Sequence, residues 1–348
     1  MSATSKDPKG LRVAVIGMGR MGIRHLQAVR RLGMDVCGVV DNSAQALDDA
    51  RTQHGVRADA CFVDAVEMLD AVRPEALVVS TTAPTHACFV VAAAERGVRY
   101  ILCEKPMATS LEECDRMSAA CARSGTLLAV NHQMRFMPQY TEARALVTSE
   151  GLGGLSSMVV AGSNFGLAMN ASHYFEAFRY VTGEQVTAVQ AWFESAQLAN
   201  PRGPQFEDRS GRLKARNSAG QVLYIDFSAA AGHGLQVIYI CRYGQVMVDE
   251  LTGDVRIAAR KPEFRQLPTT RYGMPADVAM TTISEADTVV PTIAVWNSLL
   301  AGEAYPDAAM GAQVMSCLVA AHASHESGGR EVGIDESVLL RSRVFKWA

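Results

Sequence analysis

The chain has 348 residues, of which 49% are hydrophobic and 20% charged, and its formal net charge is −3. A chain of this length and apolar content can bury a large core, which excludes a disordered protein and leaves room for two domains. Basic and acidic residues are nearly balanced and lysine and arginine form no run, so nothing points to nucleic acid or an acidic membrane surface as a partner. We expect a small-molecule ligand.

The start of the chain, the apolar stretches and the cysteines predict a cytoplasmic protein. Residues 1–10 are small and polar, and we expect a flexible tail there rather than a secretory signal. The longest apolar stretches, Cys88–Ala94 and Ala312–Ala323, fall short of the ~18 residues of a membrane span. The eight cysteines lack a C-x-x-C pair and the histidines lack the spacing of metal ligands, which indicates a reducing compartment and no metal site.

From residue 11 to 131, short β-rich apolar runs alternate with segments of helical period, a pattern typical of a parallel sheet with crossover helices. This predicts an α/β, doubly wound Rossmann domain over 11–131. Helices are expected near 21–32, 44–54, 64–72, 84–96 and 109–124. The expected strands are Arg12–Ile16, Asp35–Val40, Ala60–Val63, Ala76–Ser80, Arg99–Leu102 and Thr126–Val130.

After about residue 131, the expected strands follow one another through turns, which predicts a large, mostly antiparallel open sheet in an α+β domain over 132–348. One helix is expected at Ala171–Val181, and two late helices near 287–301 and 308–324. A loop rich in proline, glycine and charge spans Ala199–Arg212. The expected strands are Ser156–Gly166, Gln185–Ser195, Gln221–Ala229, Gln236–Cys241, Gln245–Asp249 and Val255–Ala259.

The first strand runs directly into a G-x-G-x-x-G motif and then into a helix, the context in which this motif binds a dinucleotide. Gly17 permits the tight turn, Gly19 lets the backbone approach a pyrophosphate, and Gly22 lets the helix pack on the strand. Arg20 and Met21, at the start of the helix, complete the predicted phosphate-binding turn. A glycine-rich turn without a ligand is the alternative.

Asp41 ends the second strand, where an acidic residue accepts hydrogen bonds from the adenosine ribose and repels a 2′-phosphate. NAD is therefore predicted in preference to NADP. The same side chain is also suited to cap the helix expected at 44–54, and the two roles are compatible.

Three further motifs follow the fourth, fifth and sixth expected strands: Thr82–His86, Glu104–Pro106 and Asn131–Pro138. With the glycine motif, they resemble the glucose–fructose oxidoreductase, inositol dehydrogenase and rhizopine-catabolism (Gfo/Idh/MocA) family of NAD(P)-dependent oxidoreductases. The resemblance implies hydride transfer between a secondary hydroxyl of a sugar, nucleotide sugar or polyol and the nicotinamide. All four motifs stand at carboxyl ends of strands, where open α/β sheets bind ligands.

The resemblance also implies roles for residues of the first domain. Lys105 is expected to contact the nicotinamide ribose and the reacting hydroxyl, where its charge stabilises a developing alkoxide. Glu104 is expected to bind the cofactor or to hold Lys105. Thr81, Thr82 and His86 are assigned to cofactor binding, although His86 is equally suited to be a polar helix-start residue.

In the second domain, the resembled family carries Asp-x-x-x-His, with the histidine as general acid and base. Here His173 is present but Met169 stands at the aspartate position, which leaves that pairing in doubt. An imidazole is suited to take the hydroxyl proton. Asn170 is expected either to supply a neutral hydrogen bond or to cap the helix, and Glu176 to share the face of His173.

Arg135, just past the sixth strand, is expected to donate to a substrate oxygen or to brace the hinge between the domains. Two other functions stay open. One is a redox-neutral epimerase, lyase or glycosidase that uses NAD, and the other is a non-catalytic NAD-binding regulatory protein, which Met169 at the aspartate position suggests. The resemblance further implies a homodimer or homotetramer assembled through the open face of the second-domain sheet.

Overall fold

The computed structural model divides into two compact units. Unit 1 contains Met1–Gln133, Asp287–Met315 and Arg341–Ala348, and unit 2 contains Met134–Ala286 and Ser316–Leu340. The division expected at residue 131 differs from this, because two late segments belong to unit 1. Residues 1–5 of the expected tail and 164–165 of the strand expected at Ser156–Gly166 lie outside the described residues. The structure describes residues 6–163, 166–195, 199–232, 234–268, 275–284, 287 and 289–348.

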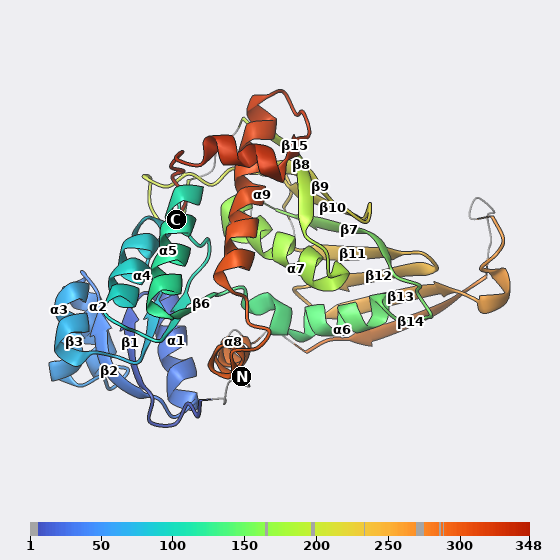
Figure 1. Ribbon diagram of the computed structural model, residues 1–348. Coiled ribbons are helices and arrows are strands. Elements are labelled where there is room, and N and C mark those ends of the chain that lie inside the picture. Colours follow the sequence, from blue (N-terminus) through green and yellow to red (C-terminus); the bar gives the residue numbers. More distant parts are fainter. Residues whose placement is uncertain are drawn as a thin grey trace. The chain divides into compact units, whose positions relative to one another are not determined.

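Within the described residues, unit 1 contains a parallel sheet of six strands in the order β3-β2-β1-β4-β5-β6 (Figure 1). Strands β2 and β3 lie on one side of β1, and strands β4, β5 and β6 lie on the other, so the order of the strands reverses between β1 and β4. Doubly wound folds bind their ligands at this switch point. The α/β prediction is confirmed. The strands are β1 Arg12–Ile16, β2 Asp35–Val40, β3 Cys61–Phe62, β4 Ala76–Val79, β5 Tyr100–Cys103 and β6 Leu127–Val130.

Helices from distant parts of the chain cover this sheet. Neighbouring helices α3, α4 and α5 pack together, whereas α1 packs against α8, which follows the first segment of unit 2 in sequence. The side chains of Val295, Trp296 and Leu299 on α8 are fully buried, and Val130 at the end of β6 donates to Pro306 O at 2.8 Å. The helices of unit 1 are α1 Arg20–Arg31, α2 Ala44–Thr52, α3 Ala65–Val72, α4 His86–Glu95, α5 Leu111–Ser124 and α8 Val289–Ala301.

The described part of unit 2 contains a larger sheet of nine strands in the order β14-β13-β12-β11-β7-β10-β9-β8-β15. Its neighbours are antiparallel except β7 and β10, which run parallel, so the predicted mostly antiparallel sheet is confirmed. The strands are β7 Leu155–Gly162, β8 Val186–Phe193, β9 Gly211–Asn217, β10 Val222–Phe227, β11 Gln236–Cys241, β12 Gly244–Asp249, β13 Asp254–Arg260, β14 Ala276–Thr282 and β15 Val332–Gly333.

The two faces of this large sheet differ in burial. Alternate residues such as Val160 and Leu223 are fully buried, and helices α6 Pro138–Val147 and α7 Ser172–Thr182 pack against β7, β11 and β12. The side chains of Trp192, Tyr224 and Ile240 point to the opposite face, with 47%, 43% and 39% of their surface exposed. A further helix, α9, spans Ala308–Glu326.

Candidate functional site

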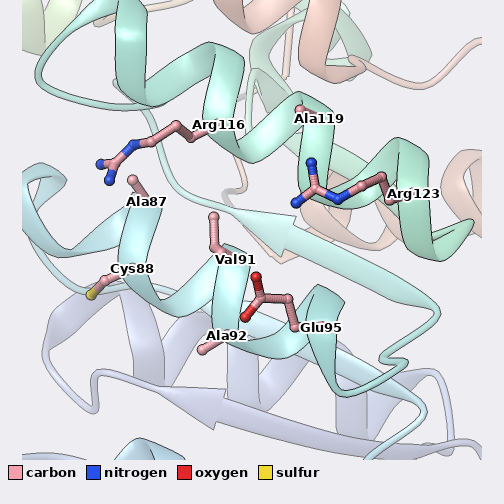
Figure 2. Close-up of a pocket in the computed structure, with 8 residues that line it drawn as sticks. All are labelled: Ala87, Cys88, Val91, Ala92, Glu95, Arg116, Ala119 and Arg123. Atoms are coloured by element: carbon pink, nitrogen blue, oxygen red, sulfur yellow. The ribbon is translucent and has the colours of Figure 1, made fainter.

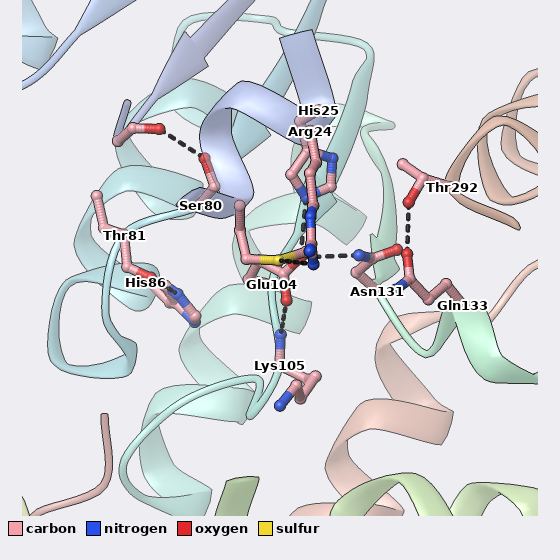
Figure 3. Close-up of polar contacts among 12 residues, drawn as sticks. Arg24, His25, Ser80, Thr81, His86, Glu104, Lys105, Asn131, Gln133 and Thr292 are labelled. Atoms are coloured by element: carbon pink, nitrogen blue, oxygen red, sulfur yellow. Dashed lines mark hydrogen bonds and ion pairs between the residues drawn. The ribbon is translucent and has the colours of Figure 1, made fainter. Parts of the chain in front are cut away.

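The turn after β1 needs two of its three glycines for packing. Gly17 has φ +93°, and a Cβ there would lie 2.8 Å from the carbonyl carbon of Ser80. A Cβ on Gly22 would lie 1.9 Å from Gly17 O. Ser80 Oγ donates to Gly17 O at 2.8 Å and joins this turn to the end of β4 (Figure 3). Gly17 and Gly22 therefore bring α1 close to the sheet.

Gly19 has a different environment, because no described atom lies within 4 Å of the position its Cβ would take. Gly19 is the N-cap of α1, and as a glycine it has no side chain that could accept from the first N–H groups of the helix. The first turn of α1 also contains no acidic residue. Arg20, which is exposed, and Met21, which is half-buried, begin the helix. An uncapped helix start with open space beside a glycine suits a pyrophosphate.

Asp41 ties the glycine turn to the end of β2. Its Oδ2 accepts from Met18 N–H at 2.7 Å and its Oδ1 from Ser43 N–H at 2.8 Å. The N-cap of α2 is Ser43, whose hydroxyl accepts from Ala46 N–H. Asp41 is therefore not the cap itself and contacts the start of this helix only through the N–H of Ser43. Each carboxylate oxygen keeps a second lone pair for a ribose hydroxyl.

The end of β5 carries a buried carboxylate with several donors (Figure 3). Glu104 Oε1 accepts from His25 Nε2–H and from Asn131 Nδ2–H, each at 2.8 Å, and Oε2 accepts from Lys105 N–H at 3.2 Å. Burial alone raises the pKa of the Glu104 carboxyl, but these hydrogen bonds and the charges of His25 and Lys105 lower it to about 2. An ionised Glu104 thus fixes the backbone that bears Lys105.

His25 was not predicted as a site residue. It lies on α1 and is fully buried, and its Nδ1 has no hydrogen-bond partner among the described residues. Nε2 is therefore the nitrogen that donates to Glu104. A histidine three residues past a glycine motif gives no sequence signal of this contact, because its partner is 79 positions away.

His86, predicted to bind the cofactor, is only 1% exposed and bridges two loops. Its Nδ1 lies 3.0 Å from Pro106 O and its Nε2 lies 3.1 Å from Thr81 O. Burial lowers the pKa of this imidazole, so the neutral ring donates to one of the two carbonyls. This geometry supports a role in positioning the loops after β4 and β5.

Thr81 and Thr82 lie on the first of these loops and are half-buried. Thr85 Oγ1 donates to Thr81 Oγ1 at 2.7 Å and to Thr82 O at 3.0 Å. The loop is therefore ordered by its own hydroxyls as well as by His86. Lys105, also half-buried, begins the second loop. The residues predicted for the cofactor thus gather at the carboxyl edge of the parallel sheet.

In unit 2, helix α7 carries His173, partly buried, as its second residue. Glu176 is 1% exposed. Both of its carboxylate oxygens accept from Arg179 at 2.7 Å, and Arg135 Nη1 lies 3.5 Å from Oε1. Burial lowers the pKa of Arg135, although the nearby carboxylate of Glu176 acts in the opposite direction. Glu176 is thus held by two arginines, which supports a bracing role for it and for Arg135.

Asn170 lies inside a five-residue π-helical turn, Leu167–Ala171, that leads into α7. Its N–H donates to Gly166 O at 3.1 Å. It is not the N-cap, because Gly166 and Ala171 hold those positions. The expectation that Asn170 caps the helix is corrected, since the helical segment begins earlier than the sequence pattern suggests.

A carboxylate does stand beside Met169, but it comes from the loop expected at Ala199–Arg212. Asp208 accepts from Ala168 N–H at 2.8 Å and from Met169 N–H at 2.9 Å. A loop aspartate 39 positions from Met169 cannot be recognised from local sequence.

A surface cavity lies elsewhere, between α4 and α5 (Figure 2). Its lining includes none of the predicted site residues and consists of Ala87, Cys88, Val91, Ala92, Glu95, Arg116, Ala119 and Arg123. Among the described residues, no group of three or more histidine, cysteine or acidic side chains is arranged to hold a metal ion. Nor does any described helix have the length and apolarity needed to cross a membrane.

Residues 11–132 match the family described as "Oxidoreductase family, NAD-binding Rossmann fold" (GFO_IDH_MocA). The chain is 26% identical over 257 residues to inositol 2-dehydrogenase 3 of Saccharopolyspora erythraea, which covers 70% of this chain and 71% of that protein. It is 32% identical over 226 residues to inositol 2-dehydrogenase of Rhodococcus erythropolis, covering 59% and 64%.

Solved structures share the fold over nearly the whole chain. An oxidoreductase from Agrobacterium radiobacter, in complex with NAD+, L-tartaric acid and magnesium, has a TM-score of 0.78 at 17% identity and covers 94% of this chain and 99% of that one. An inositol dehydrogenase homolog from Azotobacter vinelandii, complexed with NADH and myo-inositol, has a TM-score of 0.75 at 16% identity and covers 93% and 98%.

Proposed function

Since residues 11–132 make the chain a member of the GFO_IDH_MocA oxidoreductase family, we propose that it is an NAD-dependent dehydrogenase acting on a secondary hydroxyl of a sugar, nucleotide sugar or polyol. The relatives named inositol 2-dehydrogenase support a polyol or sugar substrate. The observation that carries the proposal is the end of β5, where a buried, ionised Glu104 fixes the backbone of Lys105.

The donor set at the edge of the parallel sheet fits a dinucleotide. The uncapped start of α1 at Gly19 would receive the pyrophosphate, and Asp41 would accept from the adenosine ribose. NAD, when bound, supplies the hydride acceptor. Lys105 would hold the substrate hydroxyl and stabilise negative charge on its oxygen, and His173 would take the proton from it. The catalytic pair is therefore proposed to be Lys105 and His173.

We propose NAD rather than NADP as the cofactor. Asp41 supports this, because a carboxylate already held by two backbone N–H groups cannot move away from a 2′-phosphate without releasing the glycine turn. We also propose that the protein is cytoplasmic. All eight cysteines, each within the described residues, are free thiols.

The test is NADH formation, measured by absorbance, with a panel of inositols, sugars and nucleotide sugars. We expect turnover on at least one polyol or sugar, and Lys105→Ala is expected to lower kcat by about a hundredfold or more, because an electrostatic contact to the reacting oxygen is removed. Lys9→Ala, an exposed lysine of the same unit, is the matched control.

Each other result points to a different function. Full activity in the Lys105→Ala variant would overturn the assignment of Lys105. Conversion of a sugar with NAD retained and no NADH released would indicate a redox-neutral enzyme. Calorimetric binding of NAD, with no reaction of any substrate, would indicate the regulatory protein.

A further inference from the structure

The helical segment that carries His173 is held at its start by a distant loop. Asp208 Oδ1 accepts from Ala168 N–H at 2.8 Å and Oδ2 accepts from Met169 N–H at 2.9 Å. The next residue, Arg209, accepts through its carbonyl from Leu167 N–H at 2.9 Å. Three consecutive N–H groups of the first turn are thus bound by two consecutive loop residues. These groups have no partner inside a helix and need one from outside it.

The backbone at Gly166 is shaped to admit this carboxylate. Gly166 has φ +73°, and a Cβ there would lie 2.1 Å from Asp208 Oδ2 and 2.4 Å from its Cγ. Only glycine leaves room for the carboxylate at this position. The glycine therefore lets the Asp208 carboxylate reach the backbone N–H of Met169. The side chain of Met169 itself supplies no carboxylate.

The segment between this contact and His173 is short and irregular. The π-helical turn Leu167–Ala171 runs without a break into α7, and His173 is the second residue of that helix. Asn170 N–H donates to Gly166 O at 3.1 Å and Ala171 N–H to the same oxygen at 3.4 Å. A π-turn is less stable than an α-turn and needs outside contacts to persist. The position of the imidazole thus depends on what holds residues 168 and 169.

We propose that Asp208 is a positioning residue for the general base, and that it fixes His173 by anchoring the turn before α7. The inference rests on the proposed function, in which His173 takes the substrate proton. Asp208 acts through the backbone and needs no contact with substrate. A displacement of about 1 Å at a reacting group can lower the rate by about a hundredfold.

The variant Asp208→Asn removes the charge and turns one acceptor into a donor that faces a backbone N–H. We expect kcat to fall by about 10- to 100-fold while the Kd for NAD, which unit 1 is proposed to bind, stays within about twofold of the wild-type value. Asp287→Asn is the matched control, since Asp287 accepts from Val289 and Val290 N–H at the start of α8. That helix carries no proposed catalytic residue, so kcat is expected to stay unchanged.

A second variant, Gly166→Ala, displaces the carboxylate without altering it. If both changes act through one contact, the double variant Asp208→Asn/Gly166→Ala loses no more activity than the more damaging single change. Additive losses would overturn the proposal, as would a kcat in Asp208→Asn equal to that of Asp287→Asn. Because His173→Ala is assayed in parallel, an inactive wild type or an undiminished His173→Ala variant would instead refute the proposed function.

Discussion

At the scale of single residues, the structure shows contacts within the protein for several predicted site residues. His86 reaches two backbone carbonyls and Glu176 two arginines, and these contacts hold both side chains in place within the protein. Motif position identified these residues, but the choice between ligand contact and support depends on long-range hydrogen bonds. Asp208 and His25 show the converse, because no local pattern distinguishes them. The sequence therefore predicts which residues gather at the carboxyl edge of the parallel sheet better than it predicts the contacts of each side chain.

Glu104 offers a test of stability at this scale. Its pKa is lowered to about 2 from 4.5, so its contribution to folding is present above about pH 4.5 and is lost as the pH falls towards 2. We expect Glu104→Gln to lower the free energy of unfolding at pH 7 by about 2 kcal/mol, because charge-assisted hydrogen bonds become neutral ones. Urea denaturation checks this value.

The same experiment at lower pH tests the sign. The difference between wild type and Glu104→Gln is expected to shrink as the pH falls below about 4.5. Glu95→Gln, on the exposed side of α4, is the control and is expected to change stability little at any pH. A difference that grows on acidification would contradict the assignment of an ionised buried Glu104.

Asp41 offers a test of cofactor choice. Asp41→Ser removes the carboxylate that faces the predicted ribose and adds a small hydroxyl. We expect kcat/KM for NAD to fall by about tenfold and that for NADP to rise, because the repulsion of the 2′-phosphate is lost. Steady-state kinetics with both cofactors checks this, with Asp48→Ser, an exposed residue of α2, as control. An unchanged ratio of the two values would show that Asp41 acts only on the glycine turn.

At the scale of elements, the sequence predicted best where strands are apolar. The bounds of β1, β2 and β11 agree with prediction because their residues are β-branched or buried in alternation. The strand β9 was missed, because its buried positions, Leu213 and Ala215 among them, alternate with charged side chains. Arg212 pairs with Asp226 and Arg216 with Glu331 on the open side, so tertiary contacts decide its fold.

Other missed elements have similar causes. The edge strand β14 is exposed along its whole length, so it has no buried stripe for a pattern to detect. Helix α6 has a weak apolar pattern and begins at Pro138, and its place under the large sheet stabilises it. Strand β15 has only two residues. Each element depends on partners far away in sequence.

The turn between β1 and α1 gives a prediction that separates packing from binding. Gly22→Ala is expected to lower the free energy of unfolding by about 2 kcal/mol or more, because its Cβ would overlap Gly17 O. Gly19→Ala has space for its Cβ and φ −69°, so its melting temperature is expected to stay unchanged. Its Kd for NAD is expected to rise by about tenfold, because the methyl group enters the space proposed for the pyrophosphate. Thermal melting and calorimetry measure the pair.

At the scale of the whole molecule, the parallel and antiparallel sheets were predictable from the order of strands. The return of the chain to unit 1 after residue 286 was not predictable. The late helix expected near 287–301 is apolar around its whole circumference, which indicates burial without naming its partner. In the structure α8 packs against α1. Only the three-dimensional packing of unit 1 reveals this, because the residues involved are more than 250 positions apart.

The open face of the large sheet predicts self-association. Ile240 on β11 and Tyr224 on β10, the two strands that flank β7, both expose apolar surface on this face, and exposed apolar surface of this kind can form an interface. We propose a homodimer or homotetramer through it, and we expect Ile240→Lys to shift the mass measured by light scattering towards the monomer. Val63→Lys is the control, since Val63 is an exposed apolar residue of unit 1. A wild-type monomer at micromolar concentration would contradict the proposal.

The late arrival of α8 also orders events during translation. The ribosome releases residues 11–133 long before 287–315, so α1, whose Leu26 and Val29 are fully buried in the finished protein, leaves it before α8, the helix that later packs against α1. Until then the nascent nucleotide-binding unit presents an apolar surface of the kind that chaperones recognise.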